Sequence, residues 1–310
     1  MLHNQSVSEF VIIGFDYFTP YLELFFPLFL CLFIFITVGN GIVMLVILVN
    51  SRLHKPMYLF ICALSVAEIG IVTTVYPTML ALFLGGKTSI SFGFCLLQMY
   101  AFDMFLVTEN FHLAVMAFDR YVAICLALRY HMIMTLKTSR TLIFSCWLVG
   151  FLSPLAMILL VAQLPFCGPN EVEHIFCDAA PLLTLACTST NLDVTMDLTV
   201  SSVTIILNSI FIVFIYTNIL FVILKMRTSE ERNKAFSTCT SHLVMACVFY
   251  GSAAFMYIQL QQSYSSEYDL AAAIHHSVLT PLLSPLVYSF RNKEISNCLW
   301  RHIWSKRNFY

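Results

Sequence analysis

Long apolar runs alternate with short polar stretches along the chain. A helix needs roughly 20 residues to cross about 30 Å of hydrocarbon. No shorter repeat, linker or low-complexity tract interrupts the series, so the pattern predicts one all-α domain, residues 1–310, folded as a seven-helix membrane bundle. The predicted spans cover about residues 23–49, 57–83, 93–125, 141–162, 196–226, 236–260 and 270–290.

The composition supports a membrane protein over a soluble one. Hydrophobic residues make up 59% of the chain and charged residues 11%, against about 25% charged in ordinary soluble domains. Helices buried in a large soluble core are the alternative, but such a core needs a charged surface that this chain lacks. The net charge of −1 gives no reason to expect nucleic-acid binding.

The basic residues predict the orientation, because Lys and Arg gather in cytoplasmic loops. Of the 16 Lys and Arg residues, only Lys87 falls on the side opposite to the others. Residues 1–22 are therefore expected outside and residues 291–310 in the cytoplasm, in a multi-pass protein of the plasma membrane. No cleaved signal peptide is expected, because no basic segment precedes a short apolar one. Asn4, in "NQS", is a predicted glycosylation acceptor on the outside.

The eleven cysteines divide by location. We expect those in spans or on the cytoplasmic side to be reduced, small buried apolar residues: Cys31, Cys62, Cys125, Cys146, Cys239, Cys247 and Cys298. An even number of outside cysteines predicts two disulfides in one of three connectivities. Zinc is the competing interpretation, and the absence of a Cys-x-x-Cys pair makes it the weaker one. The outside cysteines are Cys95, Cys167, Cys177 and Cys187.

Five motifs occur in order along nearly the whole chain: "GN" at 39–40, "PMYLF" at 56–60, "MAFDRYVAIC" at 116–125, "KAFSTCTSHL" at 234–243 and "PLLSPLVYSFRNKE" at 281–294. Together with "FCDAAPLLTLAC" at 176–187 they resemble the olfactory receptors, a branch of the rhodopsin-like, G-protein-coupled receptors. The resemblance implies an odorant receptor that activates a stimulatory G protein. It also implies a short amphipathic helix after the seventh span and disulfides Cys95–Cys177 and Cys167–Cys187.

The motif "MAFDRYVAIC" places Asp119, Arg120 and Tyr121 at the end of the third span. Taken alone, these residues mark where a helix leaves the bilayer. The resemblance instead implies a switch, in which Arg120 holds a contact at rest and is released to meet the G protein. Asp119 is its expected resting partner. Arginine keeps its charge, so movement must break the contact. The resemblance also implies that Tyr216 and Tyr288 pack towards Arg120 in the active form.

Two carboxylates, Glu68 and Glu109, lie inside predicted spans, where acids are costly and usually functional. Glu109 precedes Arg120 by about three helical turns, so the two share a face. The resemblance places Asn40 and Ser284 around the same polar pocket. Such a pocket holds a sodium ion, or its glutamates are protonated and hydrogen-bonded; both interpretations stay open. No other cofactor is expected.

Two positions in this pocket depart from the family pattern, which usually has Asp at Glu68 and Asn-Pro at Ser284-Pro285. A serine hydroxyl is shorter than an asparagine amide and has fewer hydrogen-bonding atoms. The departures bear on the efficiency of the switch and not on the fold. His112, near Glu109 in the third span, is expected to hydrogen-bond between helices.

The ligand is expected under the outside loop. Phe102 and Leu106 lie on the Arg120 face of the third span, 18 and 14 residues earlier, and Asp103 and Val107 flank them. For Asp103 we favour a hydrogen bond to the outside loop or to the fourth span over direct ligand contact. Apolar linings with a few polar groups are typical of small-molecule sites. The resemblance adds Val200, Ser201, Thr204, Tyr250, Ala253, Ala254, Tyr257, Ile274 and Ser277.

The sequence also bears on three other possible functions. An enzyme is not expected, because the sequence has no nucleophile–base set, phosphate loop or metal-ligand spacing. A transporter would use Glu68 and Glu109 as a proton or cation path, but the inverted repeat and paired Gly/Pro-broken helices of transporters are absent. A chemosensory receptor of the same class that acts outside olfaction is the nearer alternative.

Overall fold

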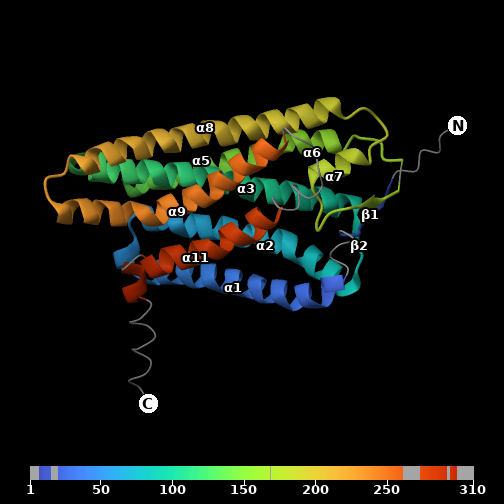
Figure 1. Cartoon of the computed structure of the whole chain (residues 1–310), viewed down its shortest axis with the longest axis horizontal. Helices are drawn as coiled ribbons and strands as arrows, with labels where there is room; N and C mark the ends of the chain where they lie inside the picture. Colours follow the sequence, from blue (N-terminus) through green and yellow to red (C-terminus); the bar gives the residue numbers. More distant parts are fainter. Residues whose placement is uncertain (1–6, 15–19, 168, 261–272, 292–293, 299–310) are drawn as a thin grey trace, which may run out of the picture.

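The long helices of the chain lie side by side in one bundle (Figure 1). The structure, a computed structural model, describes residues 7–14, 20–167, 169–260, 273–291 and 294–298. The longer helices are α1 (Leu22–Val49), α2 (Pro56–Gly85), α3 (Phe92–Cys125), α5 (Leu136–Leu152), α8 (Asn191–Leu224), α9 (Ser229–Leu260) and α11 (Thr280–Arg291). Short helices are η2 (Ser51–Leu53), η3 (Ala127–Arg129), α4 (Tyr130–Ile133), α6 (Leu155–Val161), α7 (Ala179–Thr184) and η4 (His275–Leu279).

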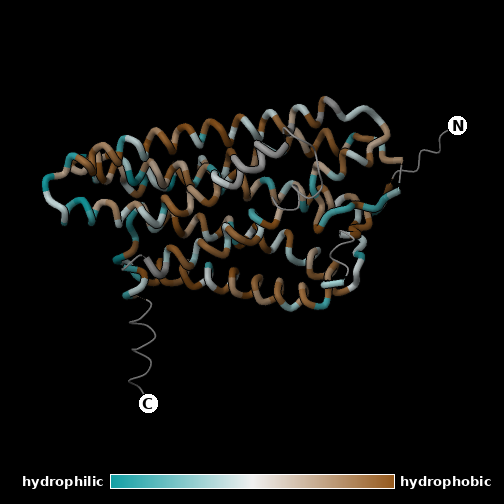
Figure 2. Tube along the Cα trace, viewed as in Figure 1, coloured by the Kyte–Doolittle hydropathy of each residue, from teal (hydrophilic) through white to brown (hydrophobic). Residues whose placement is uncertain are grey.

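The first three predicted spans match α1, α2 and α3 to within two residues at each end. Apolar residues run along these helices, and polar ones gather where the chain turns (Figure 2). Among the described residues, five helical stretches are long and apolar enough to cross a membrane: Leu22–Val49, Pro56–Gly85, Phe92–Cys125, Leu136–Val161 and Val194–Leu224. The chain is therefore a helical membrane protein.

The last two predicted spans correspond to α9 and to η4 with α11. The first residues of the span predicted at 270–290 lie outside the described part of the chain, as does Asn4. Residues 294–298 are helical. The complete amphipathic helix expected after the seventh span stays a prediction, as does the total of seven spans.

The fourth span differs from the single helix predicted at 141–162. The helix begins earlier, at Leu136, where the Thr135 hydroxyl accepts a hydrogen bond from the backbone N–H of Thr138 at 3.1 Å. It is then interrupted at Ser153 and Pro154, between α5 and α6. Proline has no N–H to donate and its ring crowds the preceding turn, which explains the interruption.

Helix α3 lies at the centre of the bundle and is approached closely by its neighbours. A Cβ added to Gly150 of α5 would lie 2.0 Å from the Thr108 hydroxyl and 2.8 Å from the Met104 carbonyl oxygen. A Cβ added to Gly70 of α2 would lie 2.4 Å from the Phe105 ring. Small residues let membrane helices approach closely. These two glycines therefore fix how α5 and α2 pack on α3.

A small sheet, not predicted from the sequence, ties the N-terminal segment to two loops. Strand β1 (Glu9–Ile12) pairs antiparallel with β2 (Thr88–Ser91) and parallel with β3 (Glu171–Val172). Phe10 and Ile12 point into the core and are fully buried. These strands have four residues or fewer. Their alternation of polar and apolar residues is therefore too short to be recognised in a sequence dominated by long apolar helices.

The disulfides lie at the same end of the bundle as the sheet, which we call the disulfide end. Cys95 is bonded to Cys177 and Cys167 to Cys187, with Cα–Cα distances of 5.3 and 5.7 Å. This pairing is the one that the family resemblance implied. Because Cys95 lies near the start of α3, its bond holds the loop that carries α7 against that helix. We call the opposite end, where α3 finishes, the Arg120 end.

We expected all of the reduced cysteines to be buried, but only some of them are. Cys146 and Cys239 are buried, but Cys31 and Cys247 are exposed. The expectation for these two was wrong, because an apolar thiol on a membrane helix has a second favourable environment, the lipid-facing surface. Cys62, Cys125 and Cys298 are half-buried.

Candidate functional site

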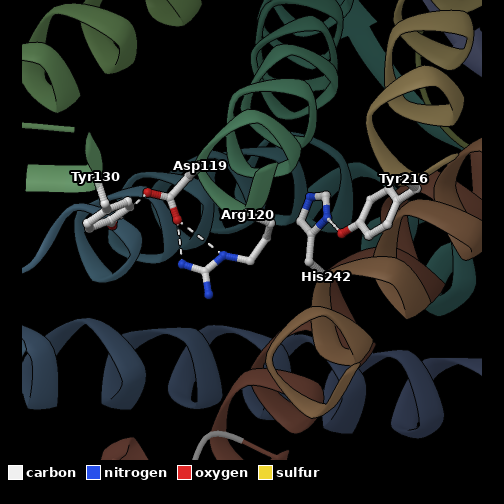
Figure 3. A network of polar contacts seen from close by, with 5 residues as sticks. All are labelled: Asp119, Arg120, Tyr130, Tyr216 and His242. Atoms are coloured by element: carbon white, nitrogen blue, oxygen red, sulfur yellow. Dashed lines mark hydrogen bonds and ion pairs between the residues drawn. The ribbon is translucent and has the colours of Figure 1, made fainter. Parts of the chain in front are cut away.

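The Arg120 contact lies at the end of α3 (Figure 3). The Arg120 guanidinium donates from Nε to Asp119 Oδ2 at 3.1 Å and from Nη2 to the same oxygen. Asp119 is fully buried, and Arg120 is 8% exposed. The contact expected between these two side chains is therefore present. Their ion pair is nearly shielded from solvent, so water screens it little.

Tyr130, the first residue of the short helix α4, completes this group and was not predicted from the sequence. Its hydroxyl donates to Asp119 Oδ1 at 2.9 Å, so both carboxylate oxygens accept hydrogen bonds. Burial, and the negative charge of Asp119 beside it, raise the pKa of the Tyr130 hydroxyl. The hydroxyl therefore keeps its proton and remains a donor to the carboxylate.

A second set of hydrogen bonds links α8, α9 and α3 beside this contact (Figure 3). His242 Nε2 lies 2.9 Å from the Leu113 carbonyl oxygen, and His242 Nδ1 is hydrogen-bonded to the Tyr216 hydroxyl. A carbonyl can only accept, so Nε2 carries the proton and Nδ1 accepts from Tyr216. His242 lies in the motif "KAFSTCTSHL", which was the available signal for it.

A cavity of about 720 Å³ opens at the Arg120 end. Arg120, Tyr130 and Tyr288 are among its lining residues, and the Tyr288 side chain is 2% exposed. At its edge, Lys55 Nζ forms an ion pair with Glu294 Oε2 at 2.8 Å. The hydrogen bonds from Lys55 lower the pKa of Glu294. Half-buried Tyr121 packs in the apolar core nearby.

The residues expected in the polar pocket come together from α1, α2, α3 and α11. Asn40, Glu68 and Glu109 are fully buried and Ser284 is 1% exposed. Asn40, Glu109 and Ser284 are the polar neighbours of Glu68. Among the described residues, no hydrogen-bond partner reaches the four glutamate oxygens, Asn40 Oδ1 or Ser284 Oγ.

These oxygens fit a small cation. Carboxylate, amide and hydroxyl oxygens are hard ligands, and buried carboxylates need either a cation or a proton. The described residues contain no group of three or more His, Cys, Asp and Glu able to hold a metal ion. Oxygen ligands of this kind suit a hard cation better than a soft transition metal.

His112 does not form the interhelical hydrogen bond that was expected. Its Nδ1 lies 2.8 Å from the Thr108 carbonyl oxygen, one turn earlier in α3. Its Nε2 has no hydrogen-bond partner among the described residues. The carbonyl one turn away is always within reach of a helical side chain, which explains why the local bond forms. The ring packs edge-on against Trp147 of α5.

Between α3, α6 and α8 lies a cavity of about 130 Å³, which we call the α3–α6–α8 cavity. An apolar cavity of about 150 Å³ holds a benzene molecule, so this one is on the scale of a single six-membered ring. Its lining includes six of the residues expected to bind ligand: Asp103, Leu106, Val107, Val200, Ser201 and Thr204. The position of Asp103 in the lining is compatible with direct ligand contact, and the hydrogen bond to the outside loop or fourth span that we favoured stays a prediction.

Other expected ligand residues lie elsewhere. Phe102 packs against Phe176 of the loop, with ring centroids 5.0 Å apart. The Tyr250 hydroxyl donates to the Asn110 carbonyl oxygen at 3.2 Å and to its Oδ1. The Ser277 hydroxyl donates to the carbonyl of the residue one turn earlier, and Ile274 is half-buried. The side chains of Ala253, Ala254 and Tyr257 lie outside the described part of the structure.

The sequence prediction missed the contribution of the fourth span to this cavity. The interruption at Pro154 brings Ser153 and Pro154, together with residues of α6, to the lining. Pro154 was the available signal, since proline interrupts helices. The missed lining residues are Asn110, Ser153, Pro154, Ala156, Met157, Leu160, Met196, Ile205, Phe249 and His276.

Comparison with known proteins gives one consistent result. A family model described as "Olfactory receptor" matches residues 29–306. Human olfactory receptor 6N1 is 42% identical over 299 residues, covering 96% of each chain. Human olfactory receptor 6Q1 is 43% identical over 298 residues, covering 96% of this chain and 94% of the relative. Human olfactory receptor 2A12 is 39% identical over 311 residues, covering 99% of this chain and all of the relative.

Proposed function

Because the chain belongs to the olfactory receptor family, and is therefore not an enzyme, we propose that it is an odorant receptor. A small organic ligand binds in the α3–α6–α8 cavity, and the receptor then activates a heterotrimeric G protein of the stimulatory type at the Arg120 end. One observation carries this proposal: α3 lines the ligand cavity at Asn110 and holds the ion pair at Arg120. Ten helical residues separate these positions, roughly 15 Å along one rigid element.

The proposal places the chain in the plasma membrane with seven spans. The disulfide end faces outside, since disulfides persist in oxidising compartments. The Arg120 end faces the cytoplasm, where the basic residues of the loops are expected. A short amphipathic helix follows the seventh span, and Asn4 is glycosylated.

Activation in this proposal is a movement of helices. At rest, Arg120 is held by Asp119, and Asp119 in turn by Tyr130. His242 holds α9 to α3 through the Leu113 carbonyl. Outward movement of α9 breaks that bond and frees Tyr216 to turn towards Arg120. The ligand drives this change only to the extent that it binds the moved arrangement more tightly.

A sodium ion in the resting receptor would be held by the polar pocket of Asn40, Glu68, Glu109 and Ser284; protonated glutamates are the alternative. The fit rests on buried oxygens that have no hydrogen-bond partner among the described residues. An ion bound only at rest opposes activation according to its concentration relative to its Kd. Here Glu68 and Glu109 supply the charge, while Asn40 and Ser284 supply neutral oxygens.

A cAMP reporter assay against a chemically diverse odorant panel tests the proposal. The wild-type receptor is expected to raise cAMP with at least one compound, and Arg120→Ala to abolish that response at equal surface display. Arg129→Ala, which removes a nearby exposed charge, is the control and keeps the response. A response that survives Arg120→Ala would contradict the proposed switch. A receptor silent to the panel while well displayed would contradict the odorant assignment.

A further inference from the structure

The α3–α6–α8 cavity reaches the side of the bundle. At its inner end, Asn110 and Phe249 are 4% and 2% exposed. At its outer rim, Met196 and Val200 of α8 are 42% and 48% exposed, and Ala156 of α6 is exposed as well. One continuous cavity therefore joins the buried residues Asn110 and Phe249 to the outer surface between α6 and α8.

We propose that ligand enters and leaves through this side opening, directly from the bilayer, so that the receptor takes uncharged lipophilic ligands. These are monocyclic molecules with one hydrogen-bonding group. The inference rests on the proposed function and deepens it by naming the route and the chemical class of ligand.

The opening lies within the part of the bundle that lipid surrounds. Ala156 belongs to the apolar stretch Leu136–Val161, and Val200 to Val194–Leu224. Ala156 precedes the end of its stretch by five residues, which puts it roughly 8 Å below that end. Lipid tails, and apolar molecules dissolved among them, therefore reach the rim.

The rim has the chemistry that such a route requires. Ala156, Met196 and Val200 are apolar, so a lipophilic molecule crosses between them without losing hydrogen bonds. Methionine is unbranched and adaptable, which lets the Met196 side chain move aside. The local cause of the opening is the interruption at Pro154, after which α6 is only seven residues long.

A ligand that entered from the disulfide end, over α3, would meet more obstruction than one that entered through the side opening. The loop held by the Cys95–Cys177 bond places Phe176, which is fully buried, against Phe102 near the start of that helix. Leu182 of α7 is also fully buried in the same apolar cluster. A ligand entering there would have to displace packed side chains, whereas the rim residues of the side opening are already exposed.

The route of entry restricts the charge of the ligand. Asp103 lies in the lining, and entry from water would not exclude cations. A permanent charge is costly to move through hydrocarbon, so a cavity filled from the bilayer excludes them. Neutral molecules instead hydrogen-bond to the polar groups of the cavity, which include Ser201, Thr204 and Asn110.

The first part of the test uses ligand chemistry. Monocyclic alcohols, ketones and esters of six to eight carbons (on the benzene scale of the cavity) are applied to cells displaying the wild-type receptor, beside benzyltrimethylammonium. Neutral members are expected to activate, and the quaternary cation to be inactive. Activation by the cation at a similar concentration would overturn the bilayer route. If other odorants act but no member of the neutral set does, the ligand class is wrong while the proposed function stands.

The second part uses kinetics, with the most active neutral member as probe. Ala156→Trp and Val200→Trp narrow the rim, and Val203→Trp is the matched control. Val203 is 50% exposed on the same helix and lies outside the described lining. A narrower passage raises the barrier equally in both directions. Onset and washout of the cAMP response should therefore both slow several-fold in Ala156→Trp, while the control matches the wild type.

The outcomes distinguish an effect on the entry route from an effect on ligand binding in the cavity. Unchanged kinetics in both rim variants, with a normal response, would overturn the side route and leave the proposed function intact. A shifted half-maximal concentration with unslowed kinetics in Ala156→Trp would show that the rim only contacts ligand, and would also overturn it. A wild-type receptor silent to every odorant would instead remove the proposed function and this inference with it.

Discussion

The carboxylate of Asp119 is the centre of the polar groups at the Arg120 end. It accepts from Arg120 on one oxygen and from Tyr130 on the other, and it is fully buried. A buried charge is stable only when it is paired and hydrogen-bonded. The two donors therefore act together to satisfy the Asp119 carboxylate, and weakening one should loosen the other.

Tyr130→Phe tests this arrangement. The change removes the hydroxyl that donates to Asp119 and leaves one buried oxygen unsatisfied, a loss of about 1.5–3 kcal/mol for a hydrogen bond to a charged group. Basal cAMP at equal surface display is expected to rise several-fold. The control is Tyr100→Phe, which removes a hydroxyl bonded to the Phe151 carbonyl at the other end of α3. Equal basal signals in both variants would show that Tyr130 does not restrain Arg120.

Glu109→Gln tests the polar pocket, where carboxylate charge is balanced by a cation or a proton. The change removes a charge that a sodium ion needs. Basal cAMP, measured with sodium varied at fixed ionic strength, should therefore depend less on sodium than in the wild type. Ser284→Asn, which places a longer oxygen-bearing arm in the pocket, should change basal activity more than odorant ranking. A wild-type receptor whose basal output ignores sodium would favour protonated glutamates.

Among the elements, α3 is the one on which the account depends, and its neighbours approach it through glycines. Gly150 faces the Thr108 hydroxyl and the Met104 carbonyl, leaving no room for a methyl group. The interface between α5 and α3 also sets the start of α6, and so the shape of the α3–α6–α8 cavity.

Gly150→Ala should therefore destabilise the receptor. The added Cβ would meet a backbone carbonyl oxygen at 2.8 Å, so the helices must separate. Overpacking of this kind costs about 1–3 kcal/mol. We expect a lower thermal midpoint in detergent and reduced surface display. Gly41→Ala, where a Cβ meets nothing within 4 Å, should leave both unchanged. Equal midpoints for the two variants would show that α5 and α3 pack differently.

The elements that were predicted well are those with a strong local signal. The apolar runs of α1, α2 and α3 end at polar turns, so the first and last residues of these helices could be predicted closely. The β1 strand has four residues and shows no alternation that stands out from the apolar helices nearby. His242 and the α6 side of the cavity were missed because their contacts join distant parts of the chain. Family resemblance, and not spacing, supplied the disulfide pairing.

For the whole molecule, the disulfide end holds several chain segments together. Strand β1 joins the N-terminal segment to β2 and β3, and the Cys95–Cys177 bond joins the loop to α3. Each disulfide restricts the unfolded chain and contributes roughly 2–4 kcal/mol. Loss of the bond to α3 should affect the whole loop, because β3 and α7 lie on the same segment.

Cys177→Ser should accordingly reduce surface display and lower the thermal midpoint. The matched control is Cys247→Ser, which removes a thiol that is exposed on α9 and has no disulfide partner; it should change little. Flow cytometry of unpermeabilised cells and thermal unfolding in detergent measure the two effects. Indistinguishable variants would contradict a stabilising role for this disulfide.

The central claim is that ligand in the α3–α6–α8 cavity acts through α3 on Arg120. The most direct measurement is nucleotide exchange on a purified stimulatory G protein by receptor-containing membranes, with and without an active odorant. Wild-type receptor should accelerate exchange when odorant is added. Leu106→Trp, which fills the cavity, should keep basal exchange but lose the odorant effect, and Arg120→Ala should lose both. An odorant effect that persists in Leu106→Trp, or in Arg120→Ala, would contradict the account.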